Sequence, residues 1–348
     1  MSDSDTTHIY DLPLNFHSLV IENTNRCNAQ CRICYQSAGP KGSETDGEST
    51  LAIETIKRVL QEAIRLPNLS KRFHLSGGEA FLFMDQSIEI YEHARATGYI
   101  DLTGTTNGFW AKHYDQGLMQ ARRLRHAGVT SLELSADSWH QAEVGSEAIS
   151  NCIEVCRKVG IAINLRLLAS HSHRHQEALL TLRPKALSKV NRITCSKVFS
   201  VGRAKKELPR TEVYQKGIGG NCYSASNLTV NAFGNVYPCC AGLDQTNKIK
   251  FGNIKAISIQ EAVRTIEASA VYRTIAFCGV EHYHPILKEA GIDLGDPNAF
   301  GNACDFCWTI FSDQRCVDII QDYHCNLAKR SLAAAIHHLE SRINSQRA

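Results

Sequence analysis

The sequence contains no block of basic residues and little excess charge of either sign. Over 348 residues, 38 Lys and Arg against 35 Asp and Glu give a formal net charge of only +3. Proteins that bind nucleic acid or a membrane surface usually gather Lys and Arg in patches or runs. No window approaches the roughly 18 apolar residues that cross a membrane. The sequence therefore predicts neither nucleic acid nor a membrane as a partner.

An export signal is also missing from the opening residues, MSDSDTTHIYDLPLNF. A secretory signal peptide has a basic stretch followed by an apolar core, so we expect a cytoplasmic protein. Cysteine, in contrast, is abundant, with 14 residues. Cytoplasmic thiols stay reduced, which argues against a disulfide framework and favours metal binding or redox chemistry.

Short apolar runs that resemble strands alternate with longer segments of helical periodicity in the first two thirds of the chain. The expected strands begin at Ser18, Arg72, Asp101, Ser131, Ala162 and Arg192. The helical pattern from Leu51 is preceded by Ser49 and Thr50, which are expected to cap it. Alternation of this kind predicts βα units around a parallel sheet. Six units are too few for a closed eight-unit barrel, so we expect an α/β fold with a partial (βα)6 barrel, whose chemistry lies at the C-terminal ends of the strands.

Four segments are expected along the chain. Residues 1–17 form an N-terminal extension, 18–207 the partial barrel, 208–325 a small cysteine-rich domain, and 326–348 a C-terminal helix. The boundary near 208 marks the point where periodic patterns give way to an irregular region rich in Gly, Asn and Cys. The Ala- and Leu-rich end predicts a packing helix with a frayed tail.

Three cysteines, Cys27, Cys31 and Cys34, follow the first expected strand in the run CNAQCRIC. Three thiolates this close can ligate three corners of a cubane iron–sulfur cluster and leave its fourth iron open to another ligand. A structural zinc site would normally close with a fourth Cys or His nearby, and none follows in this stretch. Zinc and incidental thiols are the alternatives.

This run after the first strand resembles the radical S-adenosylmethionine (SAM) superfamily, in which it holds the 4Fe-4S cluster that binds and cleaves SAM. The resemblance extends to Gly77, Gly78 and Glu79 in LSGGEAF, at the end of the second expected strand. It implies that these residues meet the methionyl amino group of SAM. Glycines let backbone approach closely, and a carboxylate accepts hydrogen bonds from an ammonium.

Further polar residues at later strand ends are expected to bind SAM. Asn107 follows the third strand, and Ser135 and Asp137 follow the fourth, where they could hold a ribose hydroxyl. The alternative is that these are ordinary turn residues. Arg166 on the fifth strand could pair with the SAM carboxylate or face solvent, and a backbone contact to adenine is expected near Gly202.

A second set of cysteines begins with the spacing Cys-x11-Gly-x4-Cys, from Cys222 through Gly234 to Cys239. This spacing resembles the start of the SPASM/twitch extensions, which carry auxiliary clusters in peptide-modifying radical SAM enzymes. A β-hairpin with its turn at 233–235 fits it. The later gaps are longer than the two-cluster pattern of that family, so we expect one auxiliary 4Fe-4S cluster. Its expected ligands are Cys222, Cys239, Cys304 and Cys307.

Alternatives remain open for these ligands. A zinc ribbon can be built from the same four cysteines. Any one of them could also be replaced by another cysteine of the region, namely Cys278, Cys316 or Cys325.

Cys240 directly follows Cys239 in the stretch YPCC. Neighbouring side chains on an extended segment point to opposite sides, so with Cys239 as a ligand Cys240 should face away, towards the barrel mouth if the hairpin packs over it. A free thiol there can donate a hydrogen atom to a carbon radical. Alternatively Cys240 is the ligand and Cys239 a packed thiol, or neither has a special role.

Taken together, SGGEAFL, TNGFW, VGRAK and the doubled cysteine resemble the epipeptide-type radical SAM peptide epimerases. The resemblance implies that Cα–H is removed from an L-residue of a ribosomally made precursor peptide and that Cys240 returns hydrogen to give a D-residue. It also implies an external electron donor of the flavodoxin or ferredoxin type. Other functions are possible. One is radical oxidation, as in peptide crosslinking or the dehydrogenation of a sugar or aminoglycoside; another is the epimerisation of such a small molecule, and a third is a zinc-stabilised scaffold without turnover.

Overall fold

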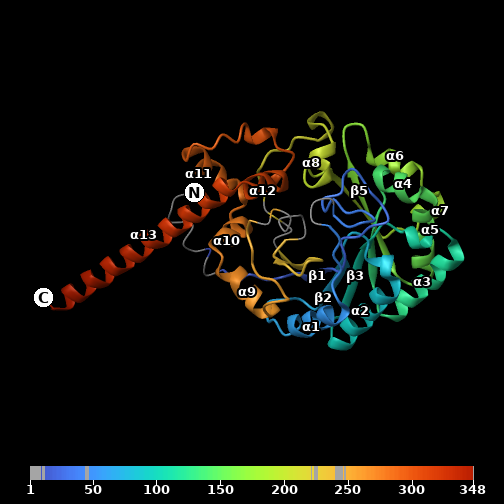
Figure 1. Cartoon of the computed structure of the whole chain (residues 1–348), viewed down its shortest axis with the longest axis horizontal. Helices are drawn as coiled ribbons and strands as arrows, with labels where there is room; N and C mark the ends of the chain where they lie inside the picture. Colours follow the sequence, from blue (N-terminus) through green and yellow to red (C-terminus); the bar gives the residue numbers. More distant parts are fainter. Residues whose placement is uncertain are drawn as a thin grey trace.

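The computed structural model describes residues 9, 12–43, 47–220, 222, 226–239, 246 and 248–347, the last range without the side chains of 334, 335 and 337–347. Its centre is one sheet with the strand order β6-β5-β4-β3-β2-β1-β7-β8, in which β1 to β6 are parallel neighbours. Figure 1 shows α1, α2, α3 and α5 along the outer side of this sheet. The predicted α/β architecture with six parallel βα units is confirmed.

All six strands begin at the residues that the sequence predicts. They are β1 Ser18–Glu22, β2 Arg72–Ser76, β3 Asp101–Thr106, β4 Ser131–Ser135, β5 Ala162–Ala169 and β6 Arg192–Lys197. The helices of the barrel are α1 Ile53–Ala63, α2 Met84–Thr97, α3 Tyr114–His126, α4 Ser138–Val144, α5 Ser146–Lys158, α6 His175–Leu180, α7 Pro184–Leu187 and α8 Arg203–Glu207. Short 3-10 turns lie at η2 Ala80–Phe83, η3 Phe109–Ala111 and η4 Arg210–Glu212.

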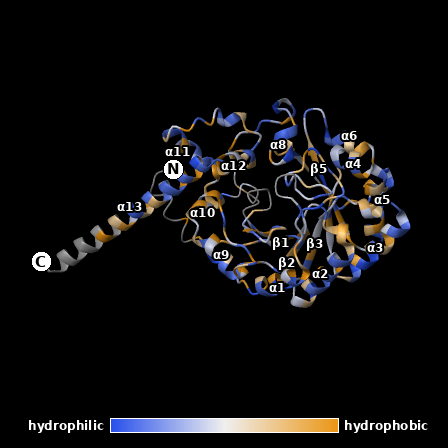
Figure 2. Cartoon of the chain, viewed as in Figure 1, coloured by the Kyte–Doolittle hydropathy of each residue, from blue (hydrophilic) through white to orange (hydrophobic). Residues whose placement is uncertain are grey.

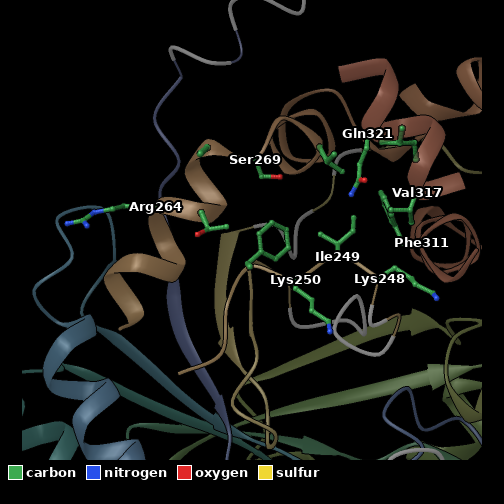
Figure 3. A pocket seen from close by; sticks show the side chains of 13 residues that line it. Lys248, Ile249, Lys250, Arg264, Ser269, Phe311, Val317 and Gln321 are labelled. Carbon is green, nitrogen blue, oxygen red and sulfur yellow. The ribbon is translucent and has the colours of Figure 1, made fainter. Parts of the chain in front are cut away.

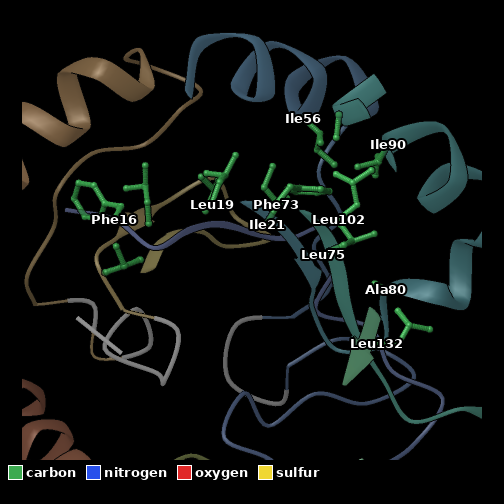
Figure 4. Close-up of a cluster of buried hydrophobic side chains, with 14 of the residues drawn as sticks. Phe16, Leu19, Ile21, Ile56, Phe73, Leu75, Ala80, Ile90, Leu102 and Leu132 are labelled. Carbon is green, nitrogen blue, oxygen red and sulfur yellow. The ribbon is translucent and has the colours of Figure 1, made fainter. Parts of the chain in front are cut away.

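The two faces of the sheet differ in chemistry because side chains alternate along each strand. Leu19, Phe73 and Leu132 point to the outer side, where they join the core beneath the helices (Figure 4). On the other face His74 bonds the hydroxyls of Thr103 and Thr105 at 2.8 and 2.9 Å. Burial, helped by Arg72, lowers the pKa of His74 to about 4. The inner face is therefore polar, which suits a ligand site rather than a packed core.

The predicted helix cap at Ser49 and Thr50 is wrong. Helix α1 begins after Ala52, whose side chain makes no capping hydrogen bond. The Ser49 hydroxyl instead donates to the Ala232 carbonyl at 2.7 Å, and the Thr50 hydroxyl bonds that of Thr24 at 2.9 Å. Both residues therefore connect the loop after β1 to its surroundings, because those tertiary partners lie closer than the helix N-terminus.

The predicted hairpin is confirmed as β7 Asn227–Val230 and β8 Val236–Tyr237, which pair antiparallel. Gly234 in its turn has a φ of +88°, which favours glycine. Strand β7 also pairs parallel with β1, from Ser18 opposite Asn227 to Ile21 opposite Val230. The cysteine-rich region thus begins by extending the barrel sheet, and its hairpin shares the barrel's hydrophobic core.

The rest of the chain is helical. Its elements are α9 Ile259–Ala268, α10 Ala270–Phe277, η7 Val280–His282, α11 Tyr283–Glu289, η8 Pro297–Ala299, α12 Ala303–Ser312 and α13 Gln314–Arg347. The expected C-terminal helix is present but begins at Gln314, well before 326. Val317 and Ile320 are buried near its start, whereas Leu332 is 63% exposed. Only the first part of α13 is a packing helix, and the rest projects from the body (Figures 1 and 2).

None of the described helices combines the length and the apolar character that crossing a membrane requires. Helix α13 has the length, with 34 residues. Charged residues such as Lys329 and Arg330 interrupt its apolar positions. This agrees with the absence of a long apolar run in the sequence.

Candidate functional site

Cys27, Cys31 and Cys34 lie in the loop between β1 and α1, at the C-terminal edge of the sheet. Cys27 and Cys31 are buried, at 8% and 6% exposure. The backbone N–H of Ala29 points at Sγ of Cys27, and that of Ala38 at Sγ of Cys34, each at 3.4 Å. Sulfurs that accept backbone hydrogen bonds fit a cluster bound by three thiolates.

The pKa values of these thiols depend on burial and on the charged groups around them. Burial, and then the Glu79 carboxylate, raise the pKa of the Cys27 thiol, with smaller contributions from Cys34 and Cys31. Burial likewise raises the pKa of Cys34. Iron ligation requires thiolates, so cluster binding would release protons here.

Within the described residues, no three His, Cys, Asp or Glu side chains are arranged to hold a single metal ion. Zinc ligands must converge on one ion, whereas the thiolates of a cubane bind separate iron atoms.

Gly77 and Gly78 lie directly against the start of the cysteine loop. The N–H of Gly78 donates to the Thr24 carbonyl, and that of Glu79 to the Arg26 carbonyl, both at 2.8 Å. A Cβ at Gly77 would lie 2.5 Å from the Thr24 oxygen, and one at Gly78 even closer to the Arg26 oxygen. The glycines thus let the end of β2 hold the backbone that leads to Cys27.

Replacing Gly78 with alanine is expected to displace this loop and to destabilise the protein by about 2 kcal/mol, as overpacking does. The iron content of the anaerobically purified protein should fall with it. Gly39→Ala is the matched control, because a Cβ there meets only the flexible Gln30 side chain, at 3.1 Å from Nε2. Full cluster loading in Gly78→Ala would contradict this role.

Glu79 is 2% exposed, and the hydrogen bonds of its carboxylate run within the protein. Oε1 accepts from the Thr106 hydroxyl at 2.9 Å and the Phe81 N–H at 3.2 Å, and Oε2 from the Asn107 N–H at 2.7 Å. Burial raises the pKa of Glu79 to about 7 against these bonds. The carboxylate therefore joins the ends of β2 and β3, a task that the sequence pattern did not reveal.

Asn107 lies beside the cysteine loop, as its position after β3 predicts. Its side-chain amide nitrogen is 3.8 Å from Sγ of Cys27 and 3.0 Å from Oδ1 of Asn28. Its Oδ1 accepts the Phe109 N–H at 3.0 Å, which is the turn role named as its alternative. Asn107 therefore has both a turn contact and a place at the site.

Asp137 divides its two oxygens between two tasks. Oδ1 accepts from the backbone N–H of His140 at 3.1 Å and lies 2.8 Å from its Nδ1, which caps α4. Oδ2 is buried without a hydrogen-bond partner in the described part of the chain. A buried oxygen of this kind fits a ligand hydroxyl. Burial alone would lower the pKa of His140, but Asp137 and then Cys31 raise it well above its usual value.

Ser135 and Arg166 are directly opposite each other on β4 and β5. Both are half-buried and lie on the polar face of the sheet. The structure thus brings these two predicted SAM residues together. Near Gly202 the expected backbone contact to adenine stays a prediction. Gly202 itself lies so close to the Tyr35 carbonyl that any Cβ would clash.

The described auxiliary cysteines gather around α10 and α12. Burial raises the pKa of Cys307, and Cys222 and Cys304 add to it. Burial also raises the pKa of Tyr272, with contributions from Cys222 and Cys239. Cys222 therefore lies near both the cysteine pair on α12 and Tyr272, the residue whose pKa Cys239 also raises.

The other cysteines of this region are placed differently. Cys278 ends α10 and is half-buried, Cys316 is 1% exposed in the first turn of α13, and Cys325 is exposed. Burial and then Asp313 raise the pKa of Cys316, and no cysteine contributes to it. Cys240 lies outside the described residues.

A cavity of about 780 Å³ lies between α9, α10, α12 and α13 (Figure 3). Its lining includes Lys248, Lys250 and Arg264 around apolar side chains such as Phe311 and Val317. None of the predicted cluster or SAM residues lines it. It is separate from the site at the strand ends.

Residues 21–171 match the Radical SAM superfamily, from β1 through the cysteine loop to just after β5. Residues 222–285 match SPASM, described as an iron–sulfur cluster-binding domain. The chain thus contains a radical SAM domain followed by a SPASM domain. A radical SAM domain uses a 4Fe-4S cluster and SAM, and a SPASM domain carries auxiliary iron–sulfur clusters. The SPASM match contains Cys222, Cys239 and Cys278 but ends before Cys304 and Cys307.

Curated relatives of this radical SAM protein match it over part of their length. A GTP 3',8-cyclase of Campylobacter curvus is 32% identical over 123 residues, 35% of either protein. A 7,8-dihydro-6-hydroxymethylpterin dimethyltransferase of Methanocaldococcus jannaschii is 26% identical over 147 residues, 40% of this chain and 27% of the relative. The chain thus spans about a third of the length of the relatives it matches.

Solved radical SAM structures share its fold over a larger part. The structure of anSMEcpe with bound AdoMet has a TM-score of 0.54 and 14% identity, covering 87% of this chain and 98% of that one. SuiB of Streptococcus suis, bound to the precursor peptide SuiA, has a TM-score of 0.52 and 12% identity, covering 74% and 66%. At such identities the likeness concerns the fold alone.

Proposed function

We propose that this radical SAM protein converts an L-residue of a ribosomally made peptide to its D-epimer. The observation that carries the proposal is the doubled cysteine. Cys222 and Cys239 both contribute to the raised pKa of Tyr272, which supports Cys239 as an auxiliary ligand and its neighbour Cys240 as a thiol left for another role. Because neighbouring side chains on an extended segment point to opposite sides, we expect the Cys240 thiol to face away from the auxiliary ligands.

When bound, the 4Fe-4S cluster and SAM supply a 5'-deoxyadenosyl radical that removes a hydrogen atom from the substrate. The residues proposed to hold the cluster are Cys27, Cys31 and Cys34. Those proposed to orient SAM at the strand ends are Gly77, Gly78, Glu79, Asn107, Ser135, Asp137 and Arg166. The unpartnered Oδ2 of Asp137 supports its place in this set.

The second half of the proposed reaction belongs to the chain itself. The Cys240 S–H bond breaks and its hydrogen atom passes to the substrate Cα from the opposite face, which inverts the centre. The resulting thiyl radical takes up one electron and one proton to become a thiol again. An external donor of the flavodoxin or ferredoxin type would supply that electron. Cys222, Cys239, Cys304 and Cys307 are the residues that would hold one auxiliary 4Fe-4S cluster, whose chemistry would be electron transfer.

The likeness in fold to SuiB, whose structure contains a precursor peptide, supports a peptide as substrate. The polar inner face of the sheet, with half-buried Glu133 and Arg166, supports a site for a polar chain. The relatives named GTP 3',8-cyclase instead favour a nucleotide, but they align with only about a third of their length.

The test is an anaerobic reaction of SAM, reductant and a candidate precursor peptide in D2O, followed by mass spectrometry and chiral amino-acid analysis. Because a thiol exchanges with solvent, we expect each product to gain one deuterium at a D-residue, alongside 5'-deoxyadenosine. A product that has lost two hydrogens would mean crosslinking or dehydrogenation and would overturn the epimerase proposal.

A further inference from the structure

We propose that Arg203 is a positioning residue that holds the three-cysteine loop in shape and sets a buried positive charge beside the cluster. This residue lies far from the loop in sequence, in the first turn of α8. It lies in the VGRAK stretch, well outside the three-cysteine run that marks the loop. The inference rests on cluster binding by Cys27, Cys31 and Cys34 and holds for any substrate.

The guanidinium of Arg203 is 2% exposed and donates into the loop at several points. Nη1 donates to the Cys31 carbonyl at 2.9 Å, and Nη2 to the carbonyls of Ser37 at 2.9 Å and Ala38 at 2.8 Å. The backbone N–H of Arg203 donates to the Cys34 carbonyl at 2.9 Å. One residue thus connects the second cysteine, the third cysteine and the turn that follows them.

The approach of Arg203 depends on the residue before it. Gly202 has a φ of +58° and contacts the Tyr35 and Cys34 carbonyls so closely that no Cβ fits. Glycine therefore lets the chain after β6 pass against the loop. Glu207, one turn along α8, lies 3.8 Å from Nε of Arg203.

A lysine cannot make the same set of contacts. The guanidinium is a planar fork whose separate nitrogens reach separate carbonyls, whereas an ammonium is a single point with three donors. Without the fork, at least some of the carbonyls of Cys31, Ser37 and Ala38 lose this donor. Buried carbonyls without partners favour a rearranged loop.

The guanidinium of Arg203 is buried and bonds the carbonyls of Cys31, Ser37 and Ala38, so its positive charge lies within the loop that carries the proposed cluster ligands. A cluster with three thiolate ligands gains one negative charge on reduction. A buried cation nearby stabilises the reduced form more than the oxidised form, because the local dielectric constant is low. Arg203 is therefore expected to raise the midpoint potential of the SAM-binding cluster.

The experiment compares Arg203→Gln and Arg203→Lys with the control Arg32→Gln. Arg32 lies in the same loop and loses the same charge, but its side chain is 56% exposed and pairs with Glu207 at 3.4 Å. For each protein we would measure iron and sulfide per chain, the melting temperature, and the midpoint potential of the EPR signal that changes on adding SAM. For each protein we would also measure the rate of 5'-deoxyadenosine formation without substrate.

In Arg203→Gln we expect a more negative midpoint potential and about tenfold slower formation of 5'-deoxyadenosine. Arg203→Lys should keep a potential near that of the wild type while binding less iron. Arg32→Gln should match the wild type in all readouts. If Arg203→Gln does not fold, Arg203→Lys still tests the role of the fork through its iron content.

Two results would overturn the inference. Full loading and an unchanged potential in Arg203→Gln would exclude both roles of the side chain. A potential in Arg203→Lys as negative as in Arg203→Gln would exclude the role of charge. Neither depends on a peptide, so a failure of the epimerase proposal would leave this outcome unaffected.

Discussion

Replacing Cys27, Cys31 and Cys34 together with alanine is expected to abolish 5'-deoxyadenosine formation while the auxiliary iron remains. The three thiols are the ligands proposed for the SAM-binding cluster, and the described part of the loop offers no substitute. The rate should fall by about a thousandfold or more, equivalent to about 4 kcal/mol in the barrier. Anaerobic iron and sulfide analysis, with product measurement by chromatography, checks this.

Cys195→Ala is the matched control, since Cys195 is exposed on β6 and belongs to neither cysteine group. Its iron content and rate should equal those of the wild type. Retention of 5'-deoxyadenosine formation in the triple variant would show that another group binds the cluster. Loss of all iron would show instead that the two sites are not loaded independently.

The Cys240→Ala variant is expected to form 5'-deoxyadenosine and keep its full iron content but to yield almost no D-residue, a loss of about a hundredfold or more. A methyl group has no weak S–H bond from which a substrate radical can take hydrogen. The fall corresponds to about 2.7 kcal/mol or more in the barrier of the return step. Chiral analysis of the hydrolysed peptide measures the D-residue, and iron analysis measures the cluster content.

Cys195→Ala again serves as the control, because Cys195 is an exposed thiol on β6 that belongs to neither cysteine group. Epimerisation at the wild-type rate by Cys240→Ala would eliminate the proposed hydrogen return. Loss of auxiliary iron in that variant would identify Cys240 as the ligand and Cys239 as the packed thiol, the alternative that the sequence left open.

The barrel could be predicted because its signals are local. Each strand from β1 to β6 is a short apolar or alternating run with turn residues after it, and its start can be read from a few neighbouring positions. The cysteine loop and the glycines at 77 and 78 are equally local patterns. Their placement at one edge of the sheet then follows from parallel topology.

The contacts that hold the site could not be predicted in the same way. Arg203 meets Cys31 across 172 positions, and Thr106 meets Glu79 across 27. Nothing in the short stretch around either residue names its partner. Ser49 shows the opposite case. Its local sequence predicts a helix cap, but its hydroxyl donates to a carbonyl 183 positions away. Tertiary partners decide such residues, and a single sequence does not show them.

The pairing of β1 with β7 has a consequence for the order in which the protein is made. The side chains of Ser18 and Asn227 meet at 2.6 Å although 209 positions separate them. While the ribosome is still completing that interval, β1 presents an open strand edge, which is a hazard for aggregation. Long-range pairing of this kind forms slowly. The loop that carries Cys27 follows that same strand, so we expect cofactor loading to come after β7 has been made and has paired with β1.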